Sequence, residues 1–334
     1  MFNKPYIIAE IGSSHMGSDK LALETIRQAK LGGADCVKFQ IYKGESIVHP
    51  RLETLKYIKF NKYKYQIDRF KKMSISIDRL KKFYDYSKKI KIDFCVTPFD
   101  PDLVKKLSKF VKFFKVASGD LNYYQLLAEI KKTNKHVILS TGMSTYDDIK
   151  NSLKFLNKKK TTLMHCVSCY PTEKKNINLI NIRELNDYFK IPVGFSDHTT
   201  GIDAPIQAIS YGAKVIEKHF VPTKGSNKSA DYPLSINYKQ LSIMKEKINT
   251  SFEMIGKKKD HILSCEIYGE KNLKRSIYAK KDIKKGDKIL LKNLICIRPF
   301  QKKGLKIENF YKVNNKKATR DILKNSLLTK KDFK

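Results

Sequence analysis

The stretch from residue 6 to residue 40 reads YIIAEIGSSHMGSDKLALETIRQAKLGGADCVKFQ and holds a strand–helix–strand pattern. Its two short apolar runs, Tyr6–Glu10 and Cys36–Gln40, flank a longer helical segment, Asp19–Leu31. Continuous apolar runs of this kind are typical of strands that are buried on both faces of a parallel sheet. The stretch therefore predicts an α/β fold with parallel strands.

The same pattern recurs along the chain. Further apolar runs, followed by helical segments, bring the number of strand–helix units to eight; these runs are Asp93–Thr97, Phe113–Val116, Val137–Ser140, Thr162–His165, Val193–Ser196 and Val215–His219. Eight units predict a closed (β/α)8 TIM barrel, which typically needs about 250 residues. The alternative is an open doubly wound sheet, but no GxGxxG motif follows the first strand.

The pattern changes after the eighth unit. We expect the barrel to occupy residues 1–255, a linker that includes the charged run 257–260 to occupy 256–273, and a small, mostly-β domain to occupy 274–334. Because so short a domain has a thin core, it should pack against a larger surface. A long insertion, 41–76, interrupts the barrel pattern. It is either a lid over the site or a surface excursion, and we favour the lid.

The composition is that of a folded protein. Of the 334 residues, 41% are hydrophobic, which suffices for a sizeable core and excludes wholesale disorder. No stretch approaches the roughly 18 apolar residues that a membrane span needs, and the N-terminus has no secretory signal pattern. We therefore expect a cytoplasmic protein with no membrane partner, whose six cysteines are thiols. The CxxC pair Cys166 and Cys169 lacks the second pair of a zinc ribbon and is interpreted as coincidental.

The charge balance is strongly basic, with 68 Lys+Arg against 33 Asp+Glu and a net charge of +35. One interpretation is a Lys-rich nucleic-acid-binding protein, which would bind DNA tightly and with a steep dependence on salt. However, the lysines are scattered along every segment, and arginine, which phosphate and base readers favour, is scarce. We therefore expect no nucleic-acid partner, and a positive field that attracts small anionic substrates.

Two lysines lie inside apolar strands of the predicted barrel. Lys38 and Gln40 are two residues apart and face the same side of their strand, and Lys115 precedes Ser118 by three residues. One buried lysine is explained equally well by a structural ion pair. Two of them, with Ser and Thr donors at neighbouring strand ends, favour a ligand that carries phosphate and carboxylate groups.

Two histidines, His198 and His219, end adjacent strands and can share one divalent metal ion. With two protein ligands, the remaining positions would be taken by water and substrate, which fits Lewis-acid catalysis and not a structural site. The alternative is that each is an ordinary buried histidine. Glu10 would point into the same cup, as a general base or as a residue that orients a substrate hydroxyl.

The motifs at these strand ends resemble those of the sialic acid synthase family, which comprises N-acetylneuraminate, legionaminate and pseudaminate synthases. They follow the family order through residues 6–231 and include Ala9-Glu10-Ile11-Gly12, Lys38-Phe39-Gln40, Lys115-Val116-Ala117-Ser118, Gly194-Phe195-Ser196-Asp197-His198 and Glu217-Lys218-His219-Phe220. The tail from residue 274, with Ser276-Ile277-Tyr278-Ala279 and Arg298-Pro299, resembles the family's small antifreeze-like (SAF) domain, a β-clip fold.

The resemblance implies a transferase that forms a C–C bond. Phosphoenolpyruvate would condense with the open-chain aldehyde of an N-acetylated amino sugar, N-acetylmannosamine or a relative. Water adds, phosphate leaves, and a nine-carbon sialic-acid-type 2-keto acid results. The cofactor would be a divalent metal ion, with Mn²⁺ expected first and Mg²⁺ or Co²⁺ as alternatives. Other hypotheses are a diamino-dideoxy hexose acceptor, as for legionaminate or pseudaminate synthases, and a metal-free enzyme on the same barrel.

The resemblance also assigns roles to single residues. The catalytic residues would be Glu10, Lys38 and Lys115. Phosphoenolpyruvate would be held by Lys38, Thr97, Lys115, Ser118, Ser168 and Ser196, and the metal by His198 and His219. The sugar would be bound by Glu10, Gln40, Tyr170, Asp231 and Arg298. In the family the protein is a homodimer whose C-terminal domain crosses to cap the partner's barrel, and Arg298 matches the arginine that then reaches the partner's sugar.

Several positions depart from the family pattern: Gln301, Lys302 and Lys303 interrupt the Gly-rich run that usually follows Arg298-Pro299, Glu173-Lys174-Lys175 stands where a Pro-Phe-Glu is common, and three single residues differ. Ser168 stands where several members have Asn or Thr, Asp120 where many have Glu, and Asn272 near where some have a capping Phe. Most of the departures lie around the sugar end of the expected site, so they leave the reaction class intact and the acceptor sugar open.

Overall fold

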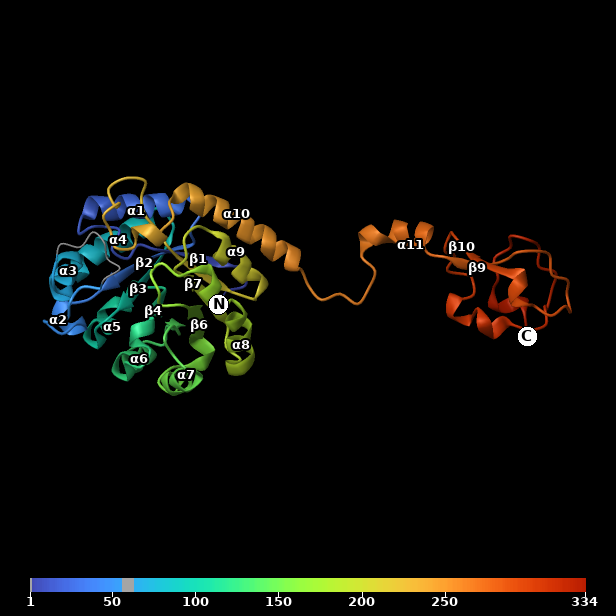
Figure 1. Ribbon diagram of the computed structural model, residues 1–334, viewed down its shortest axis with the longest axis horizontal. Helices are drawn as coiled ribbons and strands as arrows, with labels where there is room; N and C mark the ends of the chain where they lie inside the picture. The colour runs from blue at the N-terminus through green and yellow to red at the C-terminus, as the bar shows by residue number, and fades with distance from the viewer. Residues whose placement is uncertain (1, 56–62) are drawn as a thin grey trace. The chain divides into compact units, whose positions relative to one another are not determined.

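The computed structural model describes residues 2–55 and 63–334, and the chain divides into two compact units. The first unit spans Met1–Gly256 and the second spans Lys257–Lys334 (Figure 1). Each unit has its own hydrophobic core.

The first unit, which we call the barrel unit, is a closed barrel of eight parallel strands in sequence order. The TIM-barrel prediction is therefore confirmed, and the open sheet is wrong. The strands are β1 (Tyr6–Glu10), β2 (Cys36–Ile41), β3 (Asp93–Pro98), β4 (Phe113–Val116), β5 (His136–Ser140), β6 (Thr161–Cys166), β7 (Val193–Asp197) and β8 (Val215–His219). The register places Glu10 opposite both Lys38 and His219, because β1 pairs with β2 and β8.

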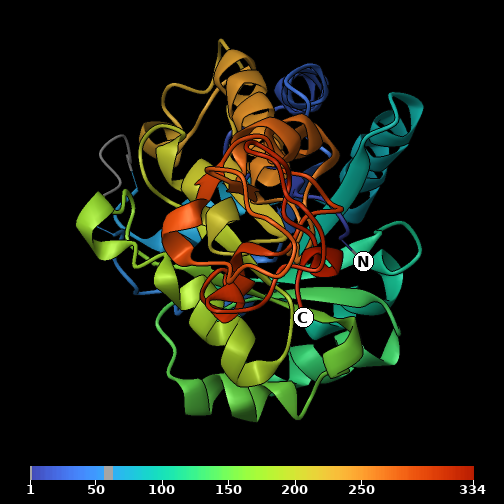
Figure 2. The ribbon, with the colours of Figure 1, turned by 90° about the vertical axis from the view of Figure 1, so that its right-hand side faces the viewer.

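Helices cover the outer side of these strands (Figures 1 and 2). They are α1 (Asp19–Leu31), α4 (Ile77–Lys89), α5 (Pro101–Leu107), α6 (Tyr124–Lys132), α7 (Tyr146–Leu153), α8 (Ile180–Phe189), α9 (Asp203–Ser210) and α10 (Tyr238–Ile255). Local signals set their ends: Ser18 caps α1, and Thr145 with Asp148 forms a capping box at α7. Their apolar faces pack on the strands, as where Phe39 of β2 stacks on Phe83 of α4.

The interior of the barrel is apolar at one end and polar at the other. A buried cluster fills the N-terminal end, and its members are Ile8, Cys36, Cys95, Phe113, Ile138, Met164 and Val215. Side chains alternate along a strand, so the inward residues two positions later on four of these strands are Glu10, Lys38, Thr97 and Lys115. Polar groups therefore gather above an apolar floor, at the end where such barrels carry their chemistry.

The insertion after β2 contains two short helices, α2 (Gly44–Ile47) and α3 (Gln66–Met73). The ring of Phe70 on α3 packs against Tyr42 with centroids 5.1 Å apart, which holds α3 near the C-terminal end of β2. Part of the insertion, residues 56–62, lies outside the described residues. The lid stays a prediction.

The second unit contains α11 (Ile267–Leu273) and an antiparallel pair, β9 (Ser276–Ala279) and β10 (Leu294–Ile297). The helix α11 lies within the segment that we expected to be a linker. Isolated antiparallel β-bridges, such as the one between Ile283 and Ile322, join further segments of this unit. The core is small, as expected for so short a domain, and consists of Ile277, Ala279, Ile283, Ile289, Leu294, Leu305, Val313, Ala318, Ile322 and Leu328.

No helix in the described part of the chain is both long enough and apolar enough to cross a membrane. All six cysteines are free thiols, as predicted from the sequence.

Candidate active site

The C-terminal ends of the strands form a polar cup, and most of the predicted site residues line it or its rim. The strands position Glu10, Lys38, Gln40, Thr97, Lys115, Ser196 and His219, and the loops that follow them position Ser118, Ser168, Tyr170, His198 and Asp231. The fold thus places residues from distant parts of the sequence at one end of the barrel. Arg298 belongs to the second unit, where it is exposed and its Nε donates to the carbonyl of Leu273.

A shared carboxylate joins the two buried lysines. Oε1 of Glu217 lies 2.9 Å from Nζ of Lys38 and 3.9 Å from Nζ of Lys115, and it also accepts a 3.0 Å hydrogen bond from Ser196. Lys38 forms a second ion pair, at 3.3 Å, with Oε2 of Glu10. Glu217 therefore centres the charge cluster. The sequence placed it at a strand end but gave it no role, because its two lysine partners come from β2 and β4, which do not pair with β8.

The charges in this cluster shift one another's pKa values. Burial opposes ionisation of Glu217, but the ammonium groups of Lys115 and Lys38 outweigh it and lower its pKa to about 2. Burial likewise opposes the charge of Lys38, yet Glu10 and Glu217 raise the pKa of that lysine. Burial lowers the pKa of Lys115. For Glu10, burial outweighs the charge of Lys38 and, with Glu217 nearby, raises the pKa to about 7.

A second group of side chains forms what we call the anion cradle, made of Ser118, Gly142, Cys166 and Ser168. The amide of Gly142 donates to Oγ of Ser118 at 3.1 Å, and Sγ of Cys166 lies 3.0 Å from the same oxygen. A Cβ on Gly142 would lie 2.5 Å from Oγ of Ser168, so only glycine fits. Beside the cradle, Nζ of Lys115 donates to Oγ of Ser140 at 2.5 Å. Hydroxyl groups and an ammonium group thus converge, as an anion requires.

The two predicted metal ligands are neighbours, with the ring centroids of His198 and His219 5.6 Å apart. Nδ1 of His198 donates to the carbonyl of Val167 at 2.7 Å, which leaves Nε2 as the nitrogen for a ligand. Burial and the adjacent His219 lower the pKa of His198 to about 4, and burial lowers the pKa of His219. Both imidazoles are therefore neutral near pH 7, which is the form that binds metal.

This donor set fits an open metal site and not a closed one. Within residues 2–55 and 63–334, no three His, Cys, Asp or Glu side chains come together as a metal-binding group. Nδ1 of His219 is buried and has no hydrogen-bond partner among these residues, and it lies 3.9 Å from Oδ2 of Asp231. Two neutral imidazoles leave positions for water and substrate, which is the arrangement of catalytic sites.

Four of the predicted sugar-binding residues, Glu10, Gln40, Tyr170 and Asp231, lie in the barrel unit, and Tyr170 and Asp231 are neighbours of the imidazole pair. Nε2 of Gln40 donates to Oε1 of Glu10 at 2.6 Å, and Oγ of Ser13 donates to Oδ2 of Asp231 at 2.7 Å. The ring of Tyr170 packs on His198 with centroids 4.3 Å apart. The backbone of Gly12 runs between these groups with a φ of +47°, and a Cβ there would lie 2.9 Å from Oδ2 of Asp231.

Several buried polar atoms in this region have no hydrogen-bond partner among the described residues; besides Oε2 of Glu10, which has its ion pair with Lys38, they are Oγ1 of Thr97, Oδ2 of Asp120, Oγ of Ser168, Oε2 of Glu217 and Nδ1 of His219. Buried polar atoms are normally satisfied, so their concentration here indicates that ligands complete the site. Asp120, one of the departures from the family pattern, is among them, and burial raises its pKa to about 6.

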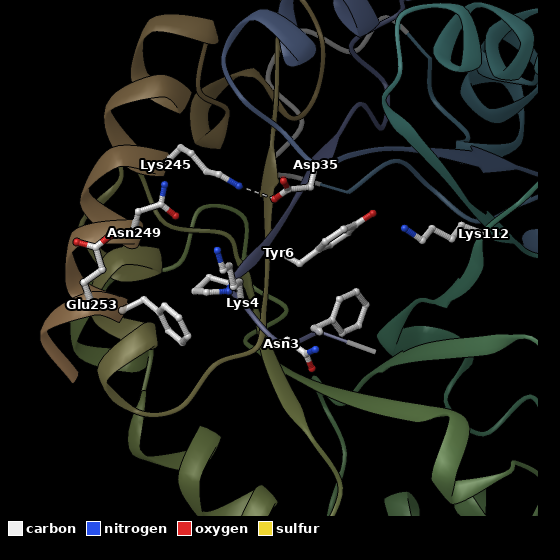
Figure 3. A pocket seen from close by; sticks show the side chains of 11 residues that line it. Asn3, Lys4, Tyr6, Asp35, Lys112, Lys245, Asn249 and Glu253 are labelled. Carbon is white, nitrogen blue, oxygen red and sulfur yellow. Dashed lines mark hydrogen bonds and ion pairs between the residues drawn. The ribbon is translucent and has the colours of Figure 1, made fainter. Parts of the chain in front are cut away.

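The opposite end of the barrel also carries a cavity, of about 580 Å³, shown in Figure 3. It is lined by Tyr6 at the start of β1, by Lys112 just before β4 and by Asp35 just before β2, and Lys245 pairs with Asp35 at 2.7 Å. These residues lie at the N-terminal strand ends. The cavity is therefore separated from the polar cup by the apolar floor of the barrel.

The chain is similar to known proteins over nearly its whole length. The NeuB family matches residues 25–260, and the SAF domain matches residues 274–334. The chain is 37% identical to an uncharacterized protein of Methanocaldococcus jannaschii, over 95% of this chain and 93% of that protein. It is 33% identical to the N,N'-diacetyllegionaminic acid synthase of Campylobacter jejuni, over 97% of this chain and 99% of that protein.

A solved structure agrees with these matches. The crystal structure of the N-acetylneuraminic acid (sialic acid) synthetase of Leptospira borgpetersenii, in complex with citrate, has a TM-score of 0.72 and 30% sequence identity, and the match covers 80% of this chain and 90% of that one. The barrel, the polar cup and these similarities lead to one conclusion: the chain belongs to the NeuB family of sialic-acid-type synthases and carries a SAF domain after its barrel.

Proposed function

We propose that the protein joins phosphoenolpyruvate to the open-chain aldehyde of an N-acetylated diamino-dideoxy hexose, and that the products are a nine-carbon legionaminic-acid-type 2-keto acid and phosphate. The observation that carries this proposal is the juxtaposition, in one buried cup, of two lysines that share Glu217 and two neutral imidazoles. The lysines suit an anionic enol ester, and the imidazoles suit a metal ion beside a carbonyl.

The phosphoenolpyruvate would lie between the two lysines and the anion cradle. Lys38, Lys115 and the carboxylate of Glu217 together carry one excess positive charge, and Thr97, Ser118, Ser168 and Ser196 provide hydroxyl groups around them. Such preorganised donors orient the enol ester and stabilise the charge that develops as phosphate departs. The hydroxyls of Thr97 and Ser168 have no hydrogen-bond partner in the described part of the chain, which supports this placement because a bound anion would satisfy them.

His198 and His219 would hold a divalent metal ion, Mn²⁺ in the first instance, which when bound polarises the aldehyde oxygen of the sugar as a Lewis acid. Mg²⁺ and Co²⁺ are the alternatives. The neutral imidazoles, and the single nitrogen that His198 has left for a ligand, support this assignment.

Glu10 is the group that we assign to proton transfer. When C3 of phosphoenolpyruvate attacks the aldehyde carbon, the aldehyde oxygen becomes a hydroxyl and must gain a proton. The pKa of Glu10, raised by burial to about 7, allows this carboxyl to hold a proton near neutral pH and to donate it. Gln40 orients the carboxyl group of Glu10, because its Nε2 donates a hydrogen bond to Oε1 of Glu10. Water then adds to the former enol carbon, and the C–O bond to phosphate breaks.

The acceptor sugar is proposed from the relatives. The N,N'-diacetyllegionaminic acid synthase aligns with nearly the whole chain, which favours a diamino-dideoxy hexose over our first expectation, N-acetylmannosamine. N-acetylmannosamine stays the second candidate because the solved N-acetylneuraminic acid synthetase is also similar. Gln40, Tyr170 and Asp231 are the residues that we propose contact the sugar.

We also propose a homodimer in which the second unit caps the barrel of the partner and Arg298 reaches the partner's sugar. The exposed side chains of α11 support an extended interface, since Ile267, Tyr268 and Leu273 are apolar and largely exposed. Arg298 itself is exposed and can take an anionic or carbonyl partner.

A phosphate-release assay tests the proposed function. Purified protein, phosphoenolpyruvate and Mn²⁺ are mixed with an N,N'-diacetylated 2,4-diamino-dideoxy hexose, with N-acetylmannosamine or with its 6-phosphate, and mass spectrometry identifies the product. We expect the highest kcat/KM with the diamino sugar and no release after chelation. Higher kcat/KM with N-acetylmannosamine would transfer the assignment to the second candidate. Tight, salt-dependent DNA binding without phosphate release from any sugar would favour the nucleic-acid-binding alternative.

A further inference from the structure

A second cavity opens beside the polar cup and carries two thiols. It has a volume of about 620 Å³ and lies between the segments that follow β5 and β6. Its lining includes Cys166 and Cys169, together with Ser168, Met143 and Asn178. Cys169 is exposed, whereas Cys166 is buried except where it meets this cavity.

Cys166 forms part of the wall between this cavity and the anion cradle. Its Sγ lies 3.0 Å from Oγ of Ser118 and would lie 3.0 Å from a Cβ on Gly142. Because Cys166 lines the cavity, a small reagent that enters the cavity can reach its sulfur, so burial in the protein does not exclude reaction at Cys166.

We propose that Cys166 is a modification site, at which a small disulfide-forming reagent caps the thiol and thereby blocks the anion cradle. The thiolate attacks a sulfur of the reagent, a new S–S bond to Cys166 forms, the bond to the leaving group breaks, and the proton of Cys166 passes to solvent. Reduction by an added thiol reverses the step. The proposal rests on the proposed function in one respect, namely that the cradle binds the phosphate of phosphoenolpyruvate.

The packing explains why a cap at this position interferes with an anion. The hydroxyls of Ser118 and Ser168 and the thiol of Cys166 all come within 3.0 Å of one point above Gly142. A group on Sγ that extends toward this point displaces the contact with Ser118, and Ser118 also accepts the hydrogen bond of Gly142. Bound phosphate, in turn, would cover the thiol and slow its reaction.

The other cysteines serve as internal controls. Cys36 and Cys95 belong to the apolar floor of the barrel, and Cys265 and Cys296 lie in the second unit. Cys169 lines the same cavity and is exposed, and its backbone carbonyl accepts a hydrogen bond from Thr172, which a change of side chain leaves in place. Cys169→Ser is therefore a matched variant in which the cradle is untouched.

The test uses methyl methanethiosulfonate, which transfers an S-methyl group to the thiolate and releases methanesulfinate. Wild type, Cys169→Ser and Cys166→Ser are treated, and phosphate release is measured against each protein's own untreated rate. We expect at least a tenfold loss in wild type and in Cys169→Ser, full recovery with dithiothreitol, and no loss in Cys166→Ser. Equal loss in Cys166→Ser would overturn the proposal.

A second readout does not depend on activity. Peptide mass spectrometry of the treated wild type follows the labelling of Cys166 and Cys169 with and without inorganic phosphate. We expect phosphate to slow labelling of Cys166 several-fold and to leave Cys169 unchanged. If phosphate slows the labelling of Cys166 but the protein has no synthase activity, the modification site stands and the proposed reaction is rejected. Labelling of Cys166 that phosphate does not slow, or that leaves phosphate release intact, would overturn the proposal that a cap on Cys166 blocks the anion cradle.

Discussion

Glu217→Gln should separate folding stability from anion binding. The substitution keeps the shape of the side chain but removes the charge that Lys38 and Lys115 share. The pKa of Glu217, about 2 against an ordinary value of 4.5, corresponds to about 3 kcal/mol of preference for the charged form. Loss of one partner from a buried ion pair typically costs about 3–5 kcal/mol. We therefore expect the free energy of unfolding of the barrel unit to fall by about 3 kcal/mol.

The same substitution should strengthen the binding of inorganic phosphate. The carboxylate of Glu217 neutralises part of the positive charge of Lys38 and Lys115. When it is removed, both ammonium groups attract the phosphate more strongly. We expect phosphate to bind at least tenfold more tightly, which is about 1.4 kcal/mol. Urea unfolding followed by circular dichroism gives the first quantity, and isothermal titration calorimetry gives the second.

The pH dependence of this effect has a definite sign. Because the pKa of Glu217 is lowered in the folded state, its contribution is present above pH 4.5 and is lost as the pH falls from 4.5 toward 2. The Gln variant should lack that part of the acid dependence. Glu129→Gln is the control, because Glu129 pairs with Lys132 on the surface and its loss should cost less than about 1 kcal/mol. An unchanged unfolding midpoint together with unchanged phosphate affinity would refute Glu217 as the shared counter-ion.

Four further substitutions test the proposed metal ligands, the anion cradle and the second unit. His198→Ala or His219→Ala should abolish turnover and weaken the binding of Mn²⁺, measured by calorimetry, while the circular dichroism spectrum stays that of the folded protein. A normal rate of phosphate release by either variant, after a chelator has removed free metal ions, would exclude the metal from the mechanism. Gly142→Ala places a Cβ 2.5 Å from Oγ of Ser168, so the KM for phosphoenolpyruvate should rise about tenfold, and an unchanged KM would show that the cradle is not its site. Arg298→Ala should raise the KM of the sugar more than that of phosphoenolpyruvate, and equal effects in steady-state kinetics would argue against a capping role.

The barrel and the location of the site could be predicted from the sequence because their signals are local. Each strand is a short continuous apolar run, since it is covered on both faces, and the polar residue that ends it, such as Glu10 or His219, follows directly. Parallel strands end at the same edge, so these residues had to share one end of the barrel.

The partners of those residues could not be predicted in the same way. Glu217 and Lys218 are adjacent in sequence, but Glu217 points into the barrel toward Lys38, whereas Lys218 pairs with the carboxylate of Asp197 at 2.6 Å. Ser140 and Gly142 were visible at a strand end, yet nothing in the sequence showed that they lie beside Lys115 and Ser118. The sequence likewise did not show that Cys166, which we interpreted as part of a coincidental CxxC pair, lies 3.0 Å from Oγ of Ser118.

The amino-acid sequence by itself determined the α/β barrel, the end at which its polar groups gather, and the types of group present there. Only the tertiary structure decided that one carboxylate serves two lysines, that two imidazoles are neutral neighbours, and that a thiol borders the anion cradle. The physical reason is that hydrophobic periodicity is a property of neighbouring residues. An ion pair or a pKa, in contrast, depends on distances across the barrel, which exist only once its eight strands have closed.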